Sequence, residues 1–255
     1  MPYTNIESCL NDLEKHGQLI RIKEEVDPYL EMAAIQLRIF ELNGKAVLFE
    51  NVKGCKYRAA ANVFGTLERC EFIFRDTLPE VKEIIALRKD PVKAVRHPFK
   101  NWRNGVAAYK ALPKKNSEKN IGQFEEIKIA DLPQVQHWEK DGGAFITLPQ
   151  VYSEDINRPG IMHSNLGMYR IQLSGNEYIP DKEIGLHYQI HRGIGVHQYL
   201  ANEKNQPLKI SVFVGGPPAH TLAAVMPLPE GLSERTFAGM LAGRRFRYFY
   251  HAGFC

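Results

Sequence analysis

This chain has few cysteines and no long apolar run. Its four cysteines lie far apart and form no Cys-x-x-Cys pair, which argues against a zinc knuckle or a disulfide framework and is typical of a reducing cytoplasm. No stretch approaches the ~20 apolar residues of a membrane-spanning helix, and the first residues lack the basic and apolar regions of a signal peptide. We therefore expect a cytoplasmic protein with no transmembrane segment.

Two kinds of ligand-binding signal are also absent from the sequence. There is neither a Walker A sequence nor a Gly-x-Gly-x-x-Gly loop, so a nucleotide phosphate would have to be held without a glycine-rich loop. The formal net charge is only +4. The basic run at residues 110–119 is interrupted by Pro113 and contains Asn and Ser, which is typical of a solvated linker and not of a nucleic-acid groove. We therefore expect no nucleic-acid partner.

The first part of the chain alternates between helix and strand signals. With 44% hydrophobic residues, the chain can bury one large core or two modest ones. The alternation predicts an α/β domain over residues 1–111. Its predicted elements are a helix with a capping box from Thr4 to Glu7 and a stop at Gly17, strands at 19–23 and 46–49, a helix at 29–42, a helix capped by Thr66 and ending at 74, and a helix opening at Pro79 and ending at 89.

The second part of the chain has a different character. Residues 112–124 are polar and show no apolar period, so we predict a linker there. Residues 125–255 form the second predicted domain, in which strands are expected to dominate, with candidates at 160–173 and 208–214. Ser233 is the predicted N-cap of a helix that Gly243 ends. The predicted fold class is therefore α+β.

Three residues of the second domain could together bind a hard metal ion. Asn165, His191 and Glu234 supply an amide, an imidazole and a carboxylate, and Mn²⁺ or Mg²⁺ prefers oxygen ligands, with imidazole acceptable to Mn²⁺. Alternative interpretations stay open, because Glu234 directly follows the predicted N-cap, where the helix dipole favours any acid. Asn165 could be an ordinary strand or turn amide. A zinc metalloprotease motif is excluded, because Tyr188 stands where it needs a glutamate.

Arg170 lies in a predicted strand apolar enough to be half buried. A buried arginine needs an anion, and its guanidinium binds a carboxylate through two parallel hydrogen bonds, which suits a carboxylic-acid substrate. Pairing with a structural Asp or Glu is the alternative. Asn165 and Arg170 are an odd number of residues apart and would point to opposite faces of an ideal strand. A shared site would need a bulge, a strand end or strong twist between them, and Gly167 is the predicted place.

Taken together, stretches from both parts of the chain resemble the UbiD family of decarboxylases, which use prenylated flavin mononucleotide (prenylated FMN). Residues 26–31, 46–54 and 62–66 resemble its N-terminal domain, and residues 162–172, 191–193 and 227–243 resemble its flavin-binding domain. The resemblance covers essentially the whole chain but only the first half of a typical member. It implies an N-terminal α/β domain followed by an incomplete split β-barrel flavin-binding domain, with the family's catalytic acids expected beyond residue 255.

Position by position, the resemblance implies a set of site residues. Asn165, His191 and Glu234 correspond to the ligands of a Mn²⁺ or Mg²⁺ ion that joins the cofactor phosphate to the protein, and a monovalent cation such as K⁺ is a further candidate. Arg170 corresponds to the catalytic residue that faces the substrate carboxylate. The implied cofactor contacts are Met168, Tyr169, Arg170, His187, Tyr188, Gln189, Arg192 and Gly193.

The implied reaction is the reversible, non-oxidative decarboxylation of an aromatic (hydroxybenzoate-type) or α,β-unsaturated acid, with the prenylated flavin as electron sink or cycloaddition partner. The resemblance also implies a role in ubiquinone biosynthesis, a flavin prenyltransferase as cofactor supplier, and a homo-oligomer in the full-length parent. We expect this chain to be an N-terminal fragment that is inactive alone. A noncatalytic flavin- or partner-binding module is the alternative, and a scaffold without cofactor would leave the joint occurrence of the motifs unexplained.

Overall fold

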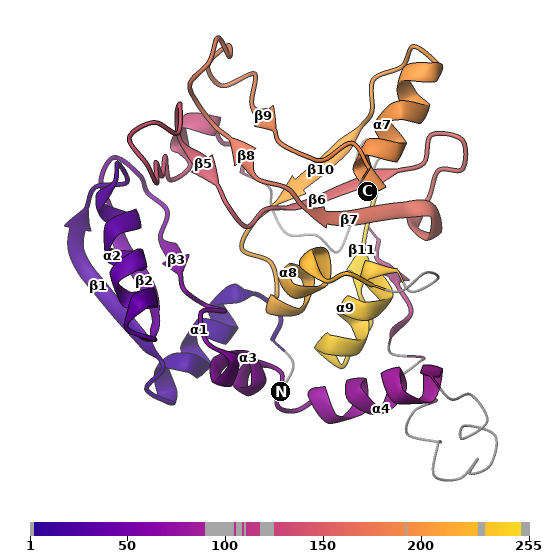
Figure 1. Cartoon of the computed structure of the whole chain (residues 1–255), viewed down its shortest axis with the longest axis horizontal. Coiled ribbons are helices and arrows are strands. Elements are labelled where there is room, and N and C mark those ends of the chain that lie inside the picture. The colour runs from indigo at the N-terminus through magenta and orange to yellow at the C-terminus, as the bar shows by residue number, and fades with distance from the viewer. Residues whose placement is uncertain are drawn as a thin grey trace.

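The computed structural model describes residues 3–89, 105, 109, 111–117, 125–191, 193–228 and 233–250. Its N-terminal unit is a small sheet with helices on both sides (Figure 1). The elements of this unit are α1 (Ile6–Lys15), β1 (Leu19–Val26), α2 (Glu31–Glu41), β2 (Ala46–Val52), β3 (Ala59–Ala61), α3 (Leu67–Ile73) and α4 (Leu78–Lys89). The strand order is β1-β2-β3, with β1 and β2 parallel and β2 and β3 antiparallel.

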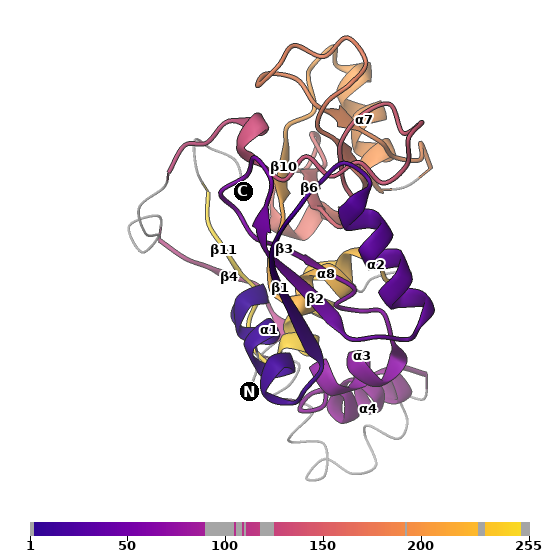
Figure 2. The ribbon, with the colours of Figure 1, turned by 90° about the vertical axis from the view of Figure 1, so that its left-hand side faces the viewer.

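Strand β2 is buried on both of its faces, because successive side chains of a strand point to opposite sides. Val47 and Phe49 pack with Met32 of α2, while Ala46 and Leu48 belong to a larger core that contains residues of α1. Figure 2 shows α1 and α2 on opposite sides of this sheet. The predicted α/β alternation of the first part of the chain is confirmed.

Local signals set several of the helix ends in this unit. The side chain of Thr66 accepts a hydrogen bond from the Arg69 amide at 3.2 Å, as expected for the N-cap of α3. Gly17, with φ +68°, follows α1 as predicted. The predicted capping box from Thr4 to Glu7 is wrong by one position. Asn5 is the N-cap of α1, and it accepts from the Ser8 amide at 2.8 Å while the Ser8 hydroxyl bonds back to the Asn5 backbone.

The second unit is built from short strands and three helices in the described residues. Its elements are β4 (Lys114–Lys115), the short 3₁₀ helix η2 (Ile129–Asp131), β5 (Phe145–Ile146), β6 (Gln150–Glu154), the 3₁₀ helix η3 (Ile161–His163), β7 (Ser164–Met168), β8 (Ile171–Gln172), β9 (Gly185–Leu186), α7 (Gly193–Glu203), β10 (Ile210–Phe213), α8 (Pro218–Val225), α9 (Glu234–Ala242) and β11 (Arg247–Tyr248). The antiparallel sheets β10-β6-β7 and β5-β8-β9 lie above α8 and α9 in Figure 1, and β4 pairs with β11 in parallel. No sheet of the described residues closes on itself, so the split barrel expected from the resemblance is not confirmed.

Two predictions for this unit need correction. The strand expected at residues 160–173 is divided into η3, β7 and β8. Strands do not dominate, because α7 and α8 span 11 and 8 residues while the longest strands here have 5. Both helices were missed, although Pro218 at the start of α8 is a recognised first-turn residue. The strand at β10 is confirmed, and so is helix α9 between Ser233 and Gly243.

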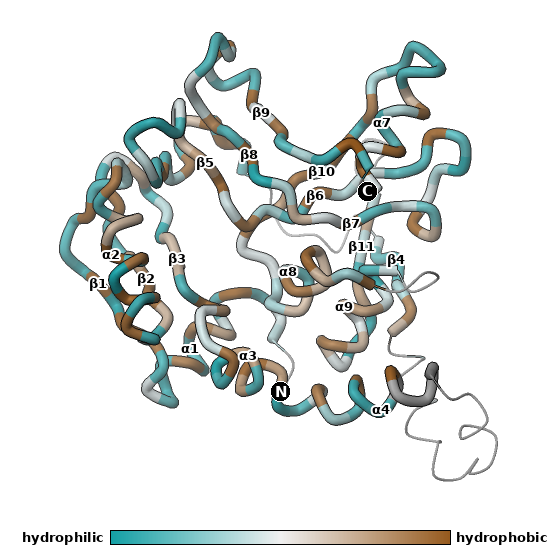
Figure 3. Tube along the Cα trace, viewed as in Figure 1, coloured by the Kyte–Doolittle hydropathy of each residue, from teal (hydrophilic) through white to brown (hydrophobic). Residues whose placement is uncertain are grey.

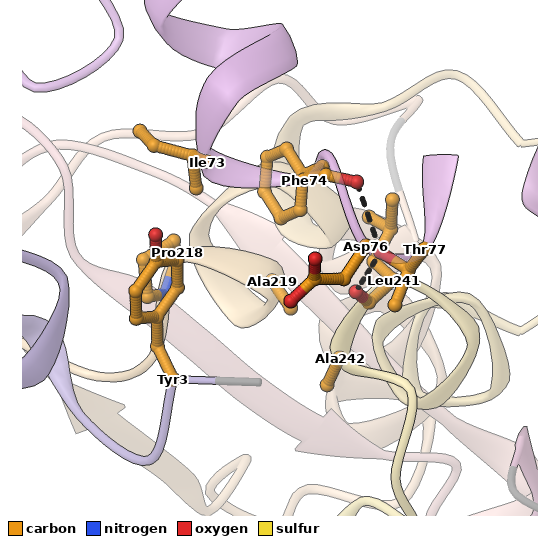
Figure 4. Close-up of a pocket in the computed structure, with 9 residues that line it drawn as sticks. All are labelled: Tyr3, Ile73, Phe74, Asp76, Thr77, Pro218, Ala219, Leu241 and Ala242. Atoms are coloured by element: carbon orange, nitrogen blue, oxygen red, sulfur yellow. Dashed lines mark hydrogen bonds between the residues drawn. The ribbon is translucent and has the colours of Figure 1, made fainter. Parts of the chain in front are cut away.

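The largest hydrophobic core joins the two units. It brings Leu13 of α1 and Ile73 of α3 together with Ala223 of α8 and Phe237 of α9. At this junction the Thr77 hydroxyl donates a hydrogen bond to the Leu241 carbonyl at 2.7 Å, beside a cavity of only about 20 Å³ (Figure 4). Since that volume holds about one water molecule, the junction is closely packed and places the second unit firmly on the first.

The outer connections are polar where the core is apolar. The segment between β8 and β9 is hydrophilic over most of its length in Figure 3.

Among the helices of the described ranges, none combines the length and apolar character that spanning a bilayer requires.

Candidate functional site

An open cavity of about 780 Å³ lies in the second unit. It is bounded by residues 165–170, which comprise the last four residues of β7 and the two residues after it, by residues 187–189 after β9, and by residues 224–228 at the end of α8. Gly193 and Glu234, the first residues of α7 and α9, complete its wall. The volume falls in the range of small-molecule and cofactor sites.

Two of the candidate metal ligands line this cavity together. Asn165 lies in β7 opposite Ser153 of β6, and Glu234 begins α9 immediately after the N-cap Ser233. The Asn165 amide donates through Nδ2 to the Tyr169 hydroxyl at 3.4 Å, which leaves Oδ1 as the atom available to a cation. A β-carbon on Gly193 would stand only 2.3 Å from that Oδ1, so glycine is what lets α7 begin so close to Asn165.

His191 is placed less directly than its two proposed co-ligands. It lies exposed in the turn before α7, two positions ahead of Gly193, and it is not among the residues that line the cavity. Within the described ranges, no group of three or more His, Cys, Asp or Glu side chains is arranged to hold a metal. Arg192 lies outside the described residues.

Arg170 reaches the cavity because a strand end lies between it and Asn165, which is one of the three predicted possibilities, although it does not lie at Gly167. Strand β7 ends at Met168 and its pairing with β6 runs without a register shift, so Gly167 carries no bulge. The strand end places Asn165 and Arg170 on one cavity despite their odd spacing. Arg170 is exposed and not half buried, and its guanidinium lies over the Phe145 ring, 4.5 Å from the ring centre. Among the described carboxylates, none forms an ion pair with it, so its guanidinium is open to an anionic ligand in the cavity.

Tyr169 folds back along β7 and closes the wall behind Asn165. A β-carbon on Gly167 would collide with the Tyr169 ring at 2.4 Å, so glycine leaves the room that the ring occupies. The ring also meets Tyr188 edge-on, with centroids 6.5 Å apart. Met168, His187, Tyr188 and Gln189, expected as cofactor contacts, also line the cavity.

Buried polar residues support β7 from behind. The Ser153 hydroxyl lies 2.9 Å from Nδ1 of His197 in α7. Burial lowers the pKa of His197, while the nearby Asp155 acts in the opposite direction. The pair therefore ties α7 to the sheet that carries Asn165.

The sequence did not indicate the apolar wall formed by residues 224–228. This wall begins in the last turn of α8, and because that helix was not predicted, nothing placed Val225 and Met226 beside β7. Phe145 and Gln172, which underlie Arg170 and His187, were also missed. They are separated by 27 positions in the sequence and meet only through the pairing of β5 with β8.

Comparison with known proteins identifies the family. Residues 110–252 match the sequence model described as 3-octaprenyl-4-hydroxybenzoate carboxy-lyase Rift-related domain, and residues 10–88 match the corresponding N-terminal domain. A protein of Chlamydia pneumoniae that is named as a subunit of 4-hydroxybenzoate decarboxylase is 36% identical over 234 residues, which cover 91% of this chain and 38% of that protein. An uncharacterised protein of Chlamydia caviae is 34% identical over 255 residues, or 97% of this chain and 42% of the relative. The chain thus spans about two-fifths of the length of these relatives.

Solved structures agree with this assignment. The closed form of vanillic acid decarboxylase from Sedimentibacter hydroxybenzoicus superposes with a TM-score of 0.78 at 25% identity, covering 98% of this chain and 51% of that chain. An evolved dimeric form of the UbiD-class enzyme HmfF from Pelotomaculum thermopropionicum, in complex with prFMN, has the same fold, with a TM-score of 0.74 at 21% identity over 98% of this chain and 53% of that chain. The chain therefore belongs to the UbiD family of decarboxylases.

Proposed function

We propose that this chain is the N-terminal portion of a UbiD-like carboxy-lyase that uses prenylated FMN for the reversible, non-oxidative decarboxylation of a hydroxybenzoate-type or α,β-unsaturated acid. One observation carries the proposal: Asn165, Arg170 and Glu234 line the same cavity. Asn165 and Arg170 would point to opposite faces of an ideal strand, and Glu234 is distant from both in the sequence. The name of the Chlamydia pneumoniae relative supports a hydroxybenzoate as the substrate class.

The residues of the cavity fit the proposed cofactor. Oxygen atoms of Asn165 and Glu234 suit Mn²⁺ or Mg²⁺, which would leave coordination positions for a phosphate, and K⁺ is a further candidate for oxygen ligands. His191 would join them as the third metal ligand. Tyr169, Tyr188 and residues 224–228 offer aromatic and apolar surface to a flavin ring. When bound, the prenylated flavin would supply the electron sink for loss of carbon dioxide.

The chain's own side chains would bind and orient the substrate. The Arg170 guanidinium would hold the substrate carboxylate through two parallel hydrogen bonds, and the apolar wall at residues 224–228 would exclude water from the aromatic ring. Glu234 is the one carboxylate that lines the cavity among the described residues, and as a proposed metal ligand it is not available to carry a proton. We therefore assign proton delivery to acidic residues of the longer protein.

The proposal extends to the organisation of that longer protein. Residues 1–111 would form the N-terminal domain and residues 112–124 the linker, although β4 within it already pairs with β11 of the second unit. Residues 125–255 would form part of a split β-barrel that later strands complete. A flavin prenyltransferase would supply the cofactor, the full-length protein would be a homo-oligomer, and ubiquinone biosynthesis is the corresponding pathway class.

The substitution Glu234→Gln tests the metal site. It keeps the shape of the side chain and removes the charge, so retention of FMN in the presence of Mn²⁺ should weaken by at least about tenfold. Glu68→Gln is the matched control, because Glu68 is an exposed acid in the first turn of α3 and loses the same helix-dipole interaction away from the cavity. Fluorescence quenching of FMN measures both. Equal retention by wild type and Glu234→Gln would refute the ligand assignment.

A noncatalytic flavin-binding module is the second candidate. The observation that favours it is that the described residues offer a cavity of cofactor size but only one lining carboxylate, Glu234. The chain loaded with prenylated FMN and Mn²⁺ should then bind 4-hydroxybenzoate without releasing carbon dioxide. Release of carbon dioxide by this chain alone would exclude the second candidate.

A further inference from the structure

The Arg170 guanidinium packs against one aromatic ring, that of Phe145. It lies 4.5 Å from the centre of that ring. The contrast in exposure is large, because Arg170 is exposed to the cavity while only 4% of Phe145 is accessible. A flexible cation therefore lies on a ring that the protein holds in place.

Phe145 is held by its backbone and by its neighbours. Its amide donates to the Val135 carbonyl at 2.8 Å, and it pairs with Gln172 across β5 and β8. The His187 ring meets it edge-on, with ring centroids 5.5 Å apart. The His187 amide also donates to the Arg170 carbonyl at 3.2 Å. His187 therefore contacts both the backbone of Arg170 and the ring of Phe145.

The orientation of His187 follows from the hydrogen bonds of Gln172. Nε2 of Gln172 donates to the Gly142 and Ser174 carbonyls at 3.3 and 3.0 Å, which fixes Oε1 as the acceptor. Nε2 of His187, 3.1 Å from that Oε1, therefore carries a proton and donates it. Because Gln172 is only 3% exposed, water competes little for these bonds.

We propose that Phe145 is a positioning residue for Arg170. Gln172 and His187 hold Phe145 in place, so that the Arg170 guanidinium is already oriented to bind a substrate carboxylate before the substrate arrives. This inference rests on the proposed function, because it assumes that Arg170 binds the carboxylate. A free arginine side chain loses much rotamer freedom when it binds a ligand. Stacking on a fixed ring removes part of that loss before binding and adds a cation–π attraction.

Charge-selective binding measures this role. The probes are 4-hydroxybenzoate and its neutral analogue 4-hydroxybenzamide, titrated into the full chain and followed by NMR. Wild type should prefer the acid, and Arg170→Ala should lose that preference. Phe145→Leu removes the ring but keeps an apolar side chain, and it should reduce the preference about threefold to tenfold. Phe145→Tyr keeps the ring and should restore it.

A matched control separates positioning from packing. Phe74 is also a buried ring, 5% exposed, and it lies in the core that joins the two units, away from Arg170. Phe74→Leu should therefore lower stability without changing the preference for the acid. If Phe145→Leu fails to fold, the wild-type protein still gives an answer, because the ring current of Phe145 should shift the Arg170 Hδ and Hε resonances upfield. Absence of that shift would overturn the proposal.

The outcomes distinguish this inference from the proposed function. A preference for the acid that is lost in Arg170→Ala but kept in a folded Phe145→Leu would overturn the positioning role and leave the proposed function intact. Equal binding of the acid and the amide by wild type would overturn both. The positioning role would be supported if Phe145→Leu loses the preference for the acid, Phe145→Tyr restores it, and Phe74→Leu leaves it unchanged.

Discussion

Replacing Gly193 by alanine should weaken ligand binding while changing the stability of the fold little. The added β-carbon would stand 2.3 Å from Oδ1 and 2.8 Å from Cγ of Asn165, whereas ordinary contact begins at 3.4 Å. The amide must therefore retreat by about 1 Å, and it can do so because it is the far end of a flexible side chain. The proposed metal ligand would move while the backbone stays.

The energetic terms of this substitution nearly cancel for folding. Alanine gains at most about 0.5–1 kcal/mol over glycine, which is the value for a helix interior, because Gly193 is the first residue of α7. Forcing the Asn165 side chain from its rotamer costs about 0.5–1.5 kcal/mol. Because 1 kcal/mol shifts the Tm of a protein of this size by about 2–4 °C, we expect a small change in Tm. Binding of FMN in the presence of Mn²⁺ should weaken about tenfold to a hundredfold, as for other changes that displace a metal ligand.

Gly239→Ala should have the opposite effect: it should lower stability and leave ligand binding unchanged. Its β-carbon would come within 2.7 Å of the Ala111 carbonyl oxygen, a backbone atom that cannot rotate away. Overpacking of this kind costs about 1–3 kcal/mol, or a fall in Tm of about 2–12 °C, and FMN binding by the folded fraction should stay normal. Differential scanning fluorimetry and FMN fluorescence quenching measure the two effects. Wild-type binding by Gly193→Ala, or a loss of Tm as large as that of Gly239→Ala, would refute the reasoning.

Two further predictions concern stability. Thr77→Val keeps the shape of the side chain but leaves the buried Leu241 carbonyl without its donor, so urea unfolding should show a loss of about 1–3 kcal/mol, and a change below about 0.5 kcal/mol would contradict it. Burial of His220 in α8, with Arg244 nearby, lowers its pKa from 6.5 to about 4. The unfolded chain therefore binds a proton between these values while the folded chain does not, so stability should fall by up to about 3 kcal/mol as the pH drops from 6.5 to 4. His220→Phe should reduce this slope, with His197 contributing the same sign; an unchanged slope would show that His220 is not the source.

The sequence predicted the N-terminal unit well because its signals are local. Thr66 and Gly17 mark helix ends through their own side chain or backbone, and β2 is recognisable as an apolar run. Helix α7 was missed for the opposite reason. It begins with two glycines among its first three residues, which disfavour a helix, and the burial of Ile194 and Ala201 against the second unit outweighs that preference.

The candidate site was foreseeable only as a set of residue types. The resemblance named Asn165, Arg170 and Glu234, and the odd spacing of the first two required a bulge, a strand end or a twist between them, but it did not indicate that β7 would end at Met168. The burial of Arg170 was predicted wrongly, because its surroundings come from β5, more than twenty positions away. Pairing between distant strands has no local signature, and so neither Phe145 nor Gln172 could be identified.

The core shared by the two units has a consequence for synthesis on the ribosome. Thr77 bonds to a residue 164 positions later, and Leu13 of α1 packs in the same core as Phe237. At about 5–20 residues per second, translation of those 164 positions takes roughly 8–33 s. For most of that interval, the apolar faces of α1 and α3 have been made but their partners in α8 and α9 have not. The nascent chain therefore lacks the native partners of these faces, and synthesis of α9 is the earliest point at which the core can close.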